Sequence, residues 1–464
     1  MAFLFDTVRD LGRLREIAGV LARHGFGELL QRTGLASLVP GKRSDSEDPG
    51  LPVRVRMVLE ELGPSFVKLG QLLSTRPDLL PAELVEELRR LQDDVPPLPF
   101  PEMRAAIESE LGAPIADLFS LFDEQPLASA SIGQVYRALL RTQEGEVAVV
   151  VKVQRPNIGP TIDRDIDLLY WFARVLERSV PELQVYSPTR LVEEFDRAIR
   201  AELDFAQEAD NAERFAHNFV ELPTVRFPYV YREFSSRKAI TMSYFDGENV
   251  FDAVAHGASA ERIAKNAVQV VVKMIFEHGF FHADPHPGNI LILGTPAEPV
   301  LGLVDLGLVG RLSPRLRDRL VDLVVAAGTR DSRAVATALF AIGKPTKKVD
   351  RVAFEAEVAR LSDKYLGRKL AEVQFSDLIR DLANASMRYG IETPPELLMV
   401  AKAVMTVEGI ARQIYPGLDV VEEMRPYFSE IAGYRYSPER LTSDALHIAT
   451  RFANAASEFP ARAE

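Results

Sequence analysis

The chain has 464 residues, of which 47% are apolar and 26% are charged. These values are ordinary for folded globular proteins, and the length is typical of two or three domains. The absence of cysteine excludes disulfides and thiolate metal sites. A net charge of −12 argues against a broad nucleic-acid-binding surface, which needs clustered Lys and Arg.

Residues 1–50 are predicted to form an amphipathic segment and a linker. Residues 1–44 carry seven Lys or Arg against four Asp or Glu, and helical spacing predicts one apolar face: Leu4, Val8, Leu11, Leu14, Ala18 and Leu21. Such a helix could lie on an anionic membrane or pack on the protein itself, and the sequence leaves both interpretations open. We expect no membrane-spanning helix and no cleavable signal, because the apolar runs are too short or interrupted by charges.

Residues 51–110 are predicted to form a helical extension with helices near 52–62, 65–75 and 81–91. Gly63-Pro64 and the segment RPDLLP separate these helices. By periodicity alone, Lys68 and Gln71 fall on the exposed side of a helix that buries Phe66, Leu69 and Leu73.

Residues 111–246 change character and are predicted to contain a β-hairpin, closed by TQEGE, and inserted helices. The helical pattern covers about 160–218 with interruptions near Pro181 and Pro188, and two more strands are expected around 227–233 and 238–245. The hairpin turn SASIG is a loop of mostly small residues. Its backbone N–H groups could approach phosphate oxygens, although small residues also occur in plain turns: Ala128, Ser129, Ala130, Ser131 and Gly133.

Lys152 lies in the apolar strand VAVVVKVQ and therefore needs a partner. It could bind nucleotide phosphates while a carboxylate on a helix holds it in position, or it could be an edge-strand lysine that points at water. We predict Glu208 as the carboxylate, since Asp204 and Glu208 are four apart on an expected helix. Glu202 does not share that face, so either it has another role or the helix breaks near Leu203.

Residues 247–464 are expected to be mostly helical, with a strand pair at 289–293 and 300–305. The segments FHADPHPGNILI and LVDLG place Asp284 five residues before Asn289, and put Asp305 after an apolar strand. In phosphoryl transfer, one carboxylate orients the acceptor while an amide and a second carboxylate hold Mg²⁺. We therefore predict Asp284 as the orienting group, and Asn289 and Asp305 as metal ligands.

Two other interpretations of this loop remain. His282 and His286 have the spacing of a zinc site, but Pro285 and Pro287 exclude the regular helix that such a pair would use. The stretch could also be a proline-rich surface loop that holds a buried, hydrogen-bonded histidine.

Together these elements predict an α+β protein with a two-lobed, protein-kinase-like fold: a helical extension, an N-lobe with inserted helices, and a C-lobe with additional helices. Nucleotide is expected between the lobes.

Several motifs in order resemble the UbiB family, also called AarF-like atypical kinases, over about residues 50–330. They are KLGQ at Lys68, PLASASIGQVYRA, VVVKVQRP, ELDFAQEADN, FHADPHPGNI and VDLGLVGRL. The resemblance implies that Lys68, Glu202 and Asp204 act near the nucleotide, where the helical preface folds over the cleft. It also implies ATP and Mg as cofactors, and a link to ubiquinone or other isoprenoid-lipid metabolism.

The chain departs from the family pattern at three places. Leu306 stands in place of the usual phenylalanine after Asp305, and Ser243 occupies a hinge position that is often acidic, so any adenine contact there must use the backbone. No paired apolar helices are expected at the carboxyl end. We expect a cytoplasmic protein with peripheral contact at the inner face of the membrane and with isoprenoid-lipid or quinone-pathway proteins as partners.

The sequence therefore predicts an ATP-binding, Mg-dependent atypical kinase or ATPase. An aminoglycoside- or choline-kinase-like enzyme is a rival, because such enzymes have a similar loop, but they lack the KLGQ preface. A nucleotide-binding pseudokinase that acts as a lipid-handling scaffold is a second rival.

Overall fold

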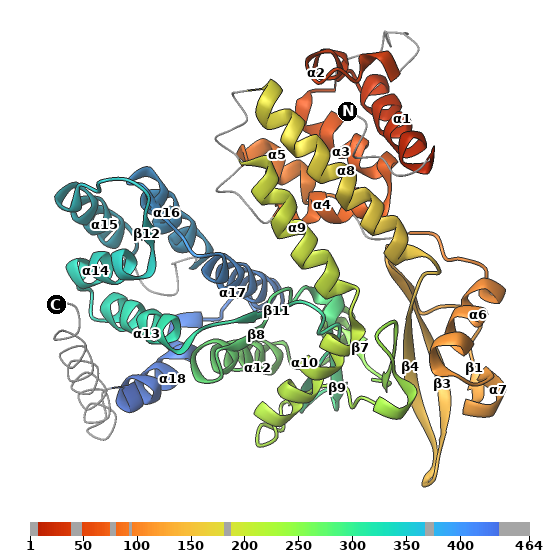
Figure 1. Ribbon diagram of the computed structural model, residues 1–464. Coiled ribbons are helices and arrows are strands. Elements are labelled where there is room, and N and C mark those ends of the chain that lie inside the picture. The colour runs from red at the N-terminus through yellow and green to blue at the C-terminus, as the bar shows by residue number, and fades with distance from the viewer. Residues whose placement is uncertain are drawn as a thin grey trace, which may run out of the picture. The chain divides into compact units, whose positions relative to one another are not determined.

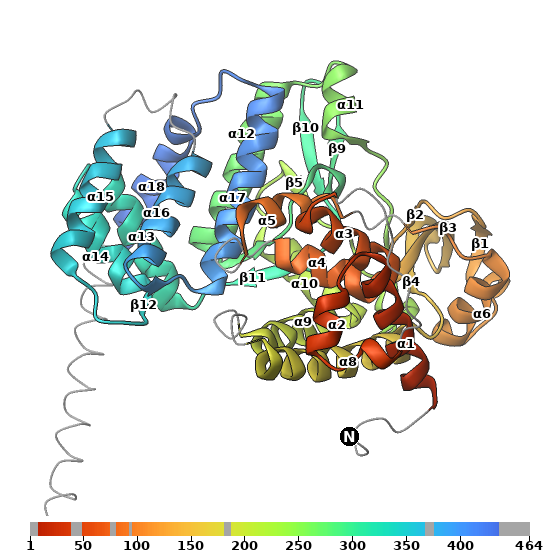
Figure 2. The same ribbon diagram turned by 90° about the horizontal axis from the view of Figure 1, so that it is seen from above.

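The computed structural model describes residues 8–38, 49–74, 80–91, 95–180, 187–366 and 375–435 (Figures 1 and 2). The chain divides into two compact units. The first unit comprises Met1–His217, Phe227–Asp246 and the short piece Asp305–Gly307. The second comprises Asn218–Arg226, Gly247–Val304 and Leu308–Glu464.

The first unit begins with short helices: α1 (Val8–Arg23), α2 (Gly27–Arg32), α3 (Leu51–Leu62), α4 (Pro64–Ser74) and α5 (Ala82–Leu88). The three helices predicted for the extension are thus confirmed. Gly63 separates α3 from α4 with a φ of 94°, which favours glycine. Gly70 of KLGQ lies so close to the side chains of Leu59 and Leu91 that a Cβ atom there would push their methyl groups aside. Glycine thus allows the close approach of these side chains to α4.

Helix α1 turns most of its predicted apolar face toward the protein. Leu14, Ala18 and Leu21 are buried, whereas Leu11 is 42% exposed, and Nε of Arg13 donates to Asp165 of α8 (Ile158–Ser179) at 2.9 Å. This favours the interpretation in which the helix packs on the protein's own body. Leu4 and most of the predicted linker lie outside the described residues.

A five-stranded antiparallel sheet follows in the first unit. Its order is β1-β3-β4-β6, with β2 paired to β3, and the strands are β1 (Phe119–Phe122), β2 (Ala128–Ser129), β3 (Gly133–Thr142), β4 (Gly145–Gln154) and β6 (Ala239–Ser243). Helices α6 (Phe100–Leu111) and α7 (Ile115–Leu118) lie beside it (Figure 1). Met103 and Ile107 of α6 share a fully buried core with strand residues, which include Tyr136, Val149, Val151 and Val153. The hairpin prediction is confirmed.

The strand predicted at 227–233 is wrong. Val230 makes only an isolated bridge to Met242, and Arg232–Phe234 form a 3-10 turn. Pro228 lacks an N–H donor for a ladder, and the side chain of Thr241 bonds the carbonyl of Phe234. The segment is thus attached to β6 largely without a strand of its own.

The long helical pattern of the first unit becomes three helices: α8, α9 (Pro188–Glu202) and α10 (Phe205–Asn218). Pro188 occupies the first turn of α9, where its missing N–H costs nothing. Leu203 and Asp204 separate α9 from α10, which confirms the break considered near Leu203.

The second unit contains a four-stranded sheet of order β5-β10-β9-β7 and a separate pair, β11-β8. The strands are β5 (Val225–Arg226), β7 (Glu248–Asn249), β8 (Phe280–His282), β9 (Ile290–Gly294), β10 (Pro299–Leu303) and β11 (Val309–Arg311). The predicted strand pair is confirmed as β9 and β10, which are antiparallel.

Helices make up the rest of the described second unit: α11 (Val250–Ala255), α12 (Ala260–Val272), α13 (Pro314–Gly328), α14 (Ser332–Ile342), α15 (Arg351–Leu366), α16 (Phe375–Arg388), α17 (Pro395–Ile414) and α18 (Val420–Arg435), with the small pair β12 (Lys344–Pro345) and β13 (Ile391–Glu392). Buried side chains of α12, α17 and α18 form one cluster, which includes Ala264, Val268, Ala411 and Met424. Of the helices described, none has the length and apolarity needed to cross a bilayer.

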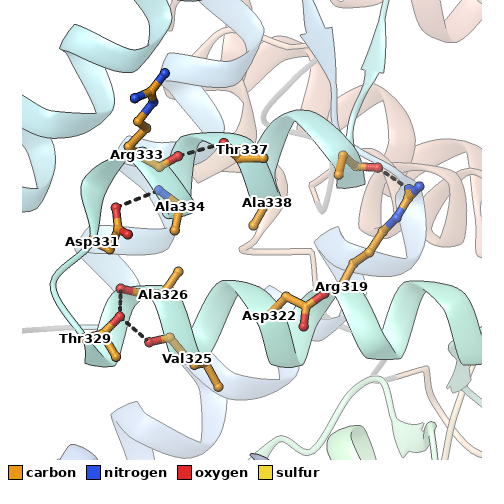
Figure 3. A pocket seen from close by; sticks show the side chains of 11 residues that line it. Arg319, Asp322, Val325, Ala326, Thr329, Asp331, Arg333, Ala334, Thr337 and Ala338 are labelled. Carbon is orange, nitrogen blue, oxygen red and sulfur yellow. Dashed lines mark hydrogen bonds between the residues drawn. The ribbon is translucent and has the colours of Figure 1, made fainter. Parts of the chain in front are cut away.

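A groove lies between α13 and α14, and alanines and polar side chains of both helices line it (Figure 3). The hydroxyl of Thr337 donates to the carbonyl of Arg333, and Asp331 caps α14 by accepting from the N–H of Ala334. None of the predicted site residues lines this groove.

Candidate active site

Lys152 is the centre of a charged cluster in the first unit. Its strand β4 lies between β3 and β6, so the interpretation as an edge-strand lysine is wrong. Nζ of Lys152 lies 2.8 Å from Glu208 Oε2 and 3.2 Å from Asp305 Oδ1. The predicted pairing with Glu208 is confirmed.

Burial and charge oppose each other in this cluster. The Lys152 side chain is 18% exposed and that of Glu208 only 3%. Desolvation alone lowers the pKa of Lys152, but the carboxylates of Asp305 and Glu208 outweigh it and raise that pKa above its ordinary value. Burial raises the pKa of Glu208, and the neighbouring ammonium opposes this. Lys152 therefore stays charged at neutral pH and is directed at its two acidic neighbours.

Asp305 has a backbone φ of 55°, in the left-handed region. Asp tolerates this conformation better than most residues, but it still costs free energy, and such residues concentrate at functional sites. The next residue, Leu306, is 1% exposed, and its carbonyl accepts a hydrogen bond of 2.9 Å from the side chain of Asn211 on α10. The side chain of Leu306 is thus buried, and its carbonyl ties the turn to α10.

Lys68 of the helical extension pairs with Glu202 at the end of α9, with Nζ 2.6 Å from Oε1. Because the Lys68 side chain is only 17% exposed, the periodicity-based expectation that it faces solvent is wrong. Glu202 is close enough to Glu208 to raise the pKa of that carboxyl. The first unit therefore brings Lys68 and Glu202 near the Lys152 cluster.

Asp204 does not lie on one helix with Glu208, so that expectation is wrong. It precedes α10, accepts from the N–H of Ala206, and pairs with Arg237 at 2.6 Å. The hydrogen bond from Arg237 holds the pKa of Asp204 below its ordinary value. A carboxylate that can bond the first turn of a helix competes with helix continuation, which explains the break.

The small-residue loop is fixed by its neighbours. The N–H of Ala130 donates to the carbonyl of Gly133, and a Cβ atom on Gly133 would lie 2.7 Å from the carbonyl oxygen of Val153. Only glycine therefore fits position 133. Ala128 and Ser129 form β2, while Ser131 is fully buried.

Arg155, which sequence reasoning missed, clamps this loop. Its Nε donates to the carbonyl of Ala130 at 2.9 Å, and its Nη2 donates to Ser129 Oγ at 2.8 Å and to the carbonyl of Pro96 at 3.0 Å. The Arg-Pro pair that follows β4 marks this position in the sequence, but the sequence does not indicate which carbonyl and hydroxyl groups the arginine bonds.

Ser243 uses both its backbone and its side chain locally. Its N–H donates to the carbonyl of Tyr229, and its hydroxyl accepts from the N–H of Tyr229.

Asp284 and Asn289 lie on one tight loop of the second unit. The carbonyl of Asp284 accepts from the N–H of His286 at 2.8 Å and from Nδ2 of Asn289 at 3.2 Å. His282 is 2% exposed, and its Nδ1 accepts from the N–H of Asp284, while Nδ1 of His286 accepts from the N–H of Gly288. Both histidines therefore shape the loop. In the described part of the chain there is no cluster of three or more His, Cys, Asp or Glu suited to a metal, which counts against the zinc interpretation.

Sequence reasoning also missed Lys402, on α17. Its Nζ lies 2.9 Å from Asp284 Oδ1, and both side chains are 34% exposed. No motif marks this lysine, because it lies 118 positions after its partner.

The predicted residues thus fall into two groups. The first unit holds Lys68, Lys152, Glu202, Asp204, Glu208, Asp305 and the small-residue loop Ala128–Gly133, and the second holds Asp284 and Asn289. The N–H of Val304 donates to the carbonyl of Asn289 at 3.0 Å, and Asp305 is the next residue of the chain.

Comparisons with known proteins agree with this architecture. Residues 90–339 match the ABC1 atypical kinase-like domain, and residues 358–419 match the UbiB helical domain. The chain is 36% identical over 394 residues to the "Probable protein kinase UbiB" of Marinobacter nauticus, covering 84% of this chain and 71% of that protein. It is 33% identical to the protein of the same name from Vibrio vulnificus, covering 98% and 85%. The chain belongs to the UbiB family of atypical kinase-like proteins.

A solved structure shows the same fold. The Rv3197–erythromycin complex from Mycobacterium tuberculosis is similar with a TM-score of 0.55 at 23% identity, covering 79% of this chain and 93% of that one. The kinase-like α+β fold predicted from the sequence is confirmed.

Proposed function

We propose that this UbiB-family protein binds ATP with Mg²⁺ and acts as an atypical kinase or ATPase that supports ubiquinone or other isoprenoid-lipid metabolism. The observation that carries the proposal is the Lys152–Glu208–Asp305 cluster. A mostly buried ammonium held by a buried carboxylate is the arrangement with which kinases bind nucleotide phosphates. Family membership supports the same conclusion.

The donor chemistry fits Mg²⁺, which prefers oxygen ligands. Asn289 uses Nδ2 to bond the carbonyl of Asp284, so its Oδ1 is the atom available to a cation. Asp305 adds a carboxylate whose side chain is 54% exposed. When bound, Mg²⁺ would neutralise charge on the phosphates.

The remaining residues have roles that follow from their chemistry. Lys152 binds phosphate oxygens, Glu208 holds Lys152 in place, and the loop Ala128–Gly133 offers backbone N–H groups to the phosphates. Asp284 orients the acceptor hydroxyl or water. The family resemblance, rather than their chemistry, implies that Lys68, Glu202 and Asp204 lie near the nucleotide and limit access by protein substrates. Contact with the membrane is peripheral.

Calorimetry with ATP, with and without Mg²⁺, tests the nucleotide proposal. The wild-type protein should bind MgATP, Lys152→Met should bind at least tenfold more weakly, and Asp305→Asn should lose the dependence on Mg²⁺. Matched controls are Lys238→Ala and Asp210→Asn, which remove exposed ion-pair partners in the same unit. The proposal fails if the wild-type protein gives no heat of binding at saturating MgATP.

The pathway needs a separate test in the host. Deletion of the gene should change the profile of quinones or other isoprenoid lipids. Expression of the Asp210→Asn variant in the deletion strain should restore the profile, whereas expression of Asp305→Asn should not. An unchanged profile after deletion would remove the lipid part of the proposal and leave the nucleotide part standing.

A further inference from the structure

We propose that Lys402, from the helical domain, is a positioning residue for the reaction, which holds the carboxylate of Asp284 in the orientation that serves the phosphate acceptor. This inference rests on the proposed function and deepens it. It also gives the helical part of the second unit a direct role in the chemistry.

The backbone of Asp284 is already fixed on both sides. Its N–H donates to His282, and its carbonyl accepts from His286 and Asn289. Its carboxylate, at the end of a rotatable side chain, is the part that these bonds leave undetermined. The ion pair with Lys402 at 2.9 Å supplies that restraint through Oδ1. The second oxygen, Oδ2, accepts no hydrogen bond from the described residues, so it can face an acceptor hydroxyl or water.

Helix α17 provides a rigid support for Lys402. Val400 and Ala403 next to it are buried, and so are Val407, Ile410 and Ala411 further along the helix. Ala411 belongs to the core shared with α12. The carbonyl of Lys402 is bonded both within the helix and by the hydroxyl of Thr406, at 2.8 Å. The ammonium group of Lys402 therefore extends from a helix whose backbone is held in place by packing.

Helix α17 also contacts β11. That strand pairs with β8 in the register Val309 opposite His282, two residues before Asp284. One continuous packed path thus joins the lysine and the carboxylate within the second unit.

Stability alone does not account for the pair. Both side chains are one-third exposed, and ion pairs between exposed groups contribute only about 0–1 kcal/mol. The loop His282–Asn289 contains no Lys or Arg of its own, so its carboxylate receives a cation only from elsewhere in the fold. A small energetic contribution at a chemically important carboxylate points to positioning.

Steady-state phosphate release from MgATP tests the inference. Lys402→Ala should lower kcat at least tenfold and change KM for ATP less than twofold, because nucleotide binding by Lys152 and Glu208 does not depend on this lysine. Lys402→Arg, which keeps a cation, should recover most of kcat. Lys273→Ala is the matched control, since Lys273 forms an ion pair with Glu277 in the same unit.

A double-mutant comparison excludes a merely structural role. Lys402→Ala combined with Asp284→Asn should be no slower than Asp284→Asn alone, because the lysine acts through that carboxylate. The inference is overturned if Lys402→Ala behaves like Lys273→Ala, if Arg fails to rescue a folded protein, or if the two losses simply add. If Asp284→Asn loses turnover while Lys402→Ala keeps the wild-type kcat, the inference about Lys402 is overturned and the proposed function stands. A wild-type protein without turnover would instead count against the proposed function.

Discussion

Two buried ion pairs of the first unit and the Lys402–Asp284 pair of the second hold their charges in different ways. In the first unit, Glu208 is 3% exposed beside Lys152, and Asp165 is 2% exposed beside Arg13. In the second, Asp284 and Lys402 are each 34% exposed. A buried pair cannot separate without leaving an unpaired charge in the interior, whereas a half-exposed pair can open to water or substrate at little cost. The Lys152 and Arg13 pairs are therefore suited to a fixed charge pattern, while Lys402 holds the Asp284 carboxylate at a place that water and substrate can still reach.

The largest expected effect comes from breaking the most buried pair. Lys152→Met should lower the free energy of unfolding by about 3 kcal/mol, because it leaves Glu208 as an unpaired carboxyl in the interior. Urea unfolding measures this loss. The double variant Lys152→Met/Glu208→Leu should regain much of the stability but not MgATP binding. If the single variant is as stable as the wild-type protein, burial does not make the Lys152–Glu208 pair costlier to break than the exposed Lys402–Asp284 pair.

Arg13→Ala comes next, with an expected loss of about 2 kcal/mol. Arg13 is 16% exposed and also donates to the carbonyl of Leu62 at 2.7 Å. Its removal therefore loosens the attachment of α1 and leaves the buried carboxylate of Asp165 without its ion-pair partner. Arg23→Ala is the control, since that exposed side chain pairs at the surface. If the two variants unfold alike and only Arg13→Ala loses binding to anionic vesicles, the membrane-facing interpretation of α1 would return.

Arg155→Ala should weaken ATP binding about tenfold, or about 1.4 kcal/mol, because the small-residue loop loses its side-chain clamp. Calorimetry measures this change, with Arg104→Ala as a control on an exposed arginine of α6. Equal affinity in both variants would mean that the backbone bonds of the loop suffice to hold it.

The smallest effect concerns acid. Arg237 holds the pKa of Asp204 below its ordinary value, so this pair stabilises the protein at pH values above that ordinary value of about 4. The contribution disappears as the pH falls through the lowered pKa. Asp204→Asn should thus cost less than about 1 kcal/mol at pH 7, and the difference from wild type should shrink in acid. A difference in urea unfolding that grows on acidification would contradict this assignment.

Much of the site follows from local sequence. Lys152 in an apolar strand and Glu208 in a helix are required to find partners, because a buried charge without one is too costly. The spacing of Asp284, Asn289 and Asp305 likewise reflects a short loop and a strand. The helices of the extension were predictable from periodicity and from Gly63 and Pro64, whose backbone preferences act within a few residues.

Two of the failures, at Lys68 and Lys402, share one physical cause. Lys68 was expected in solvent, yet it meets Glu202 from a helix 134 residues away, and Lys402 meets Asp284 across 118 residues. Periodicity states which face of a helix is apolar, but not which other element covers its polar side. Asp204 failed for a local reason, because its side chain bonds the next helix and ends the previous one.

The sequence by itself determined the class of fold, the family and the residues that carry charge at the predicted site. Those features depend on residue type, on spacing and on neighbours along the chain. Only the tertiary structure decided which charges are paired, because pairs such as Lys402 with Asp284 and Arg155 with the small-residue loop arise when packed helices and strands bring distant side chains within hydrogen-bonding distance.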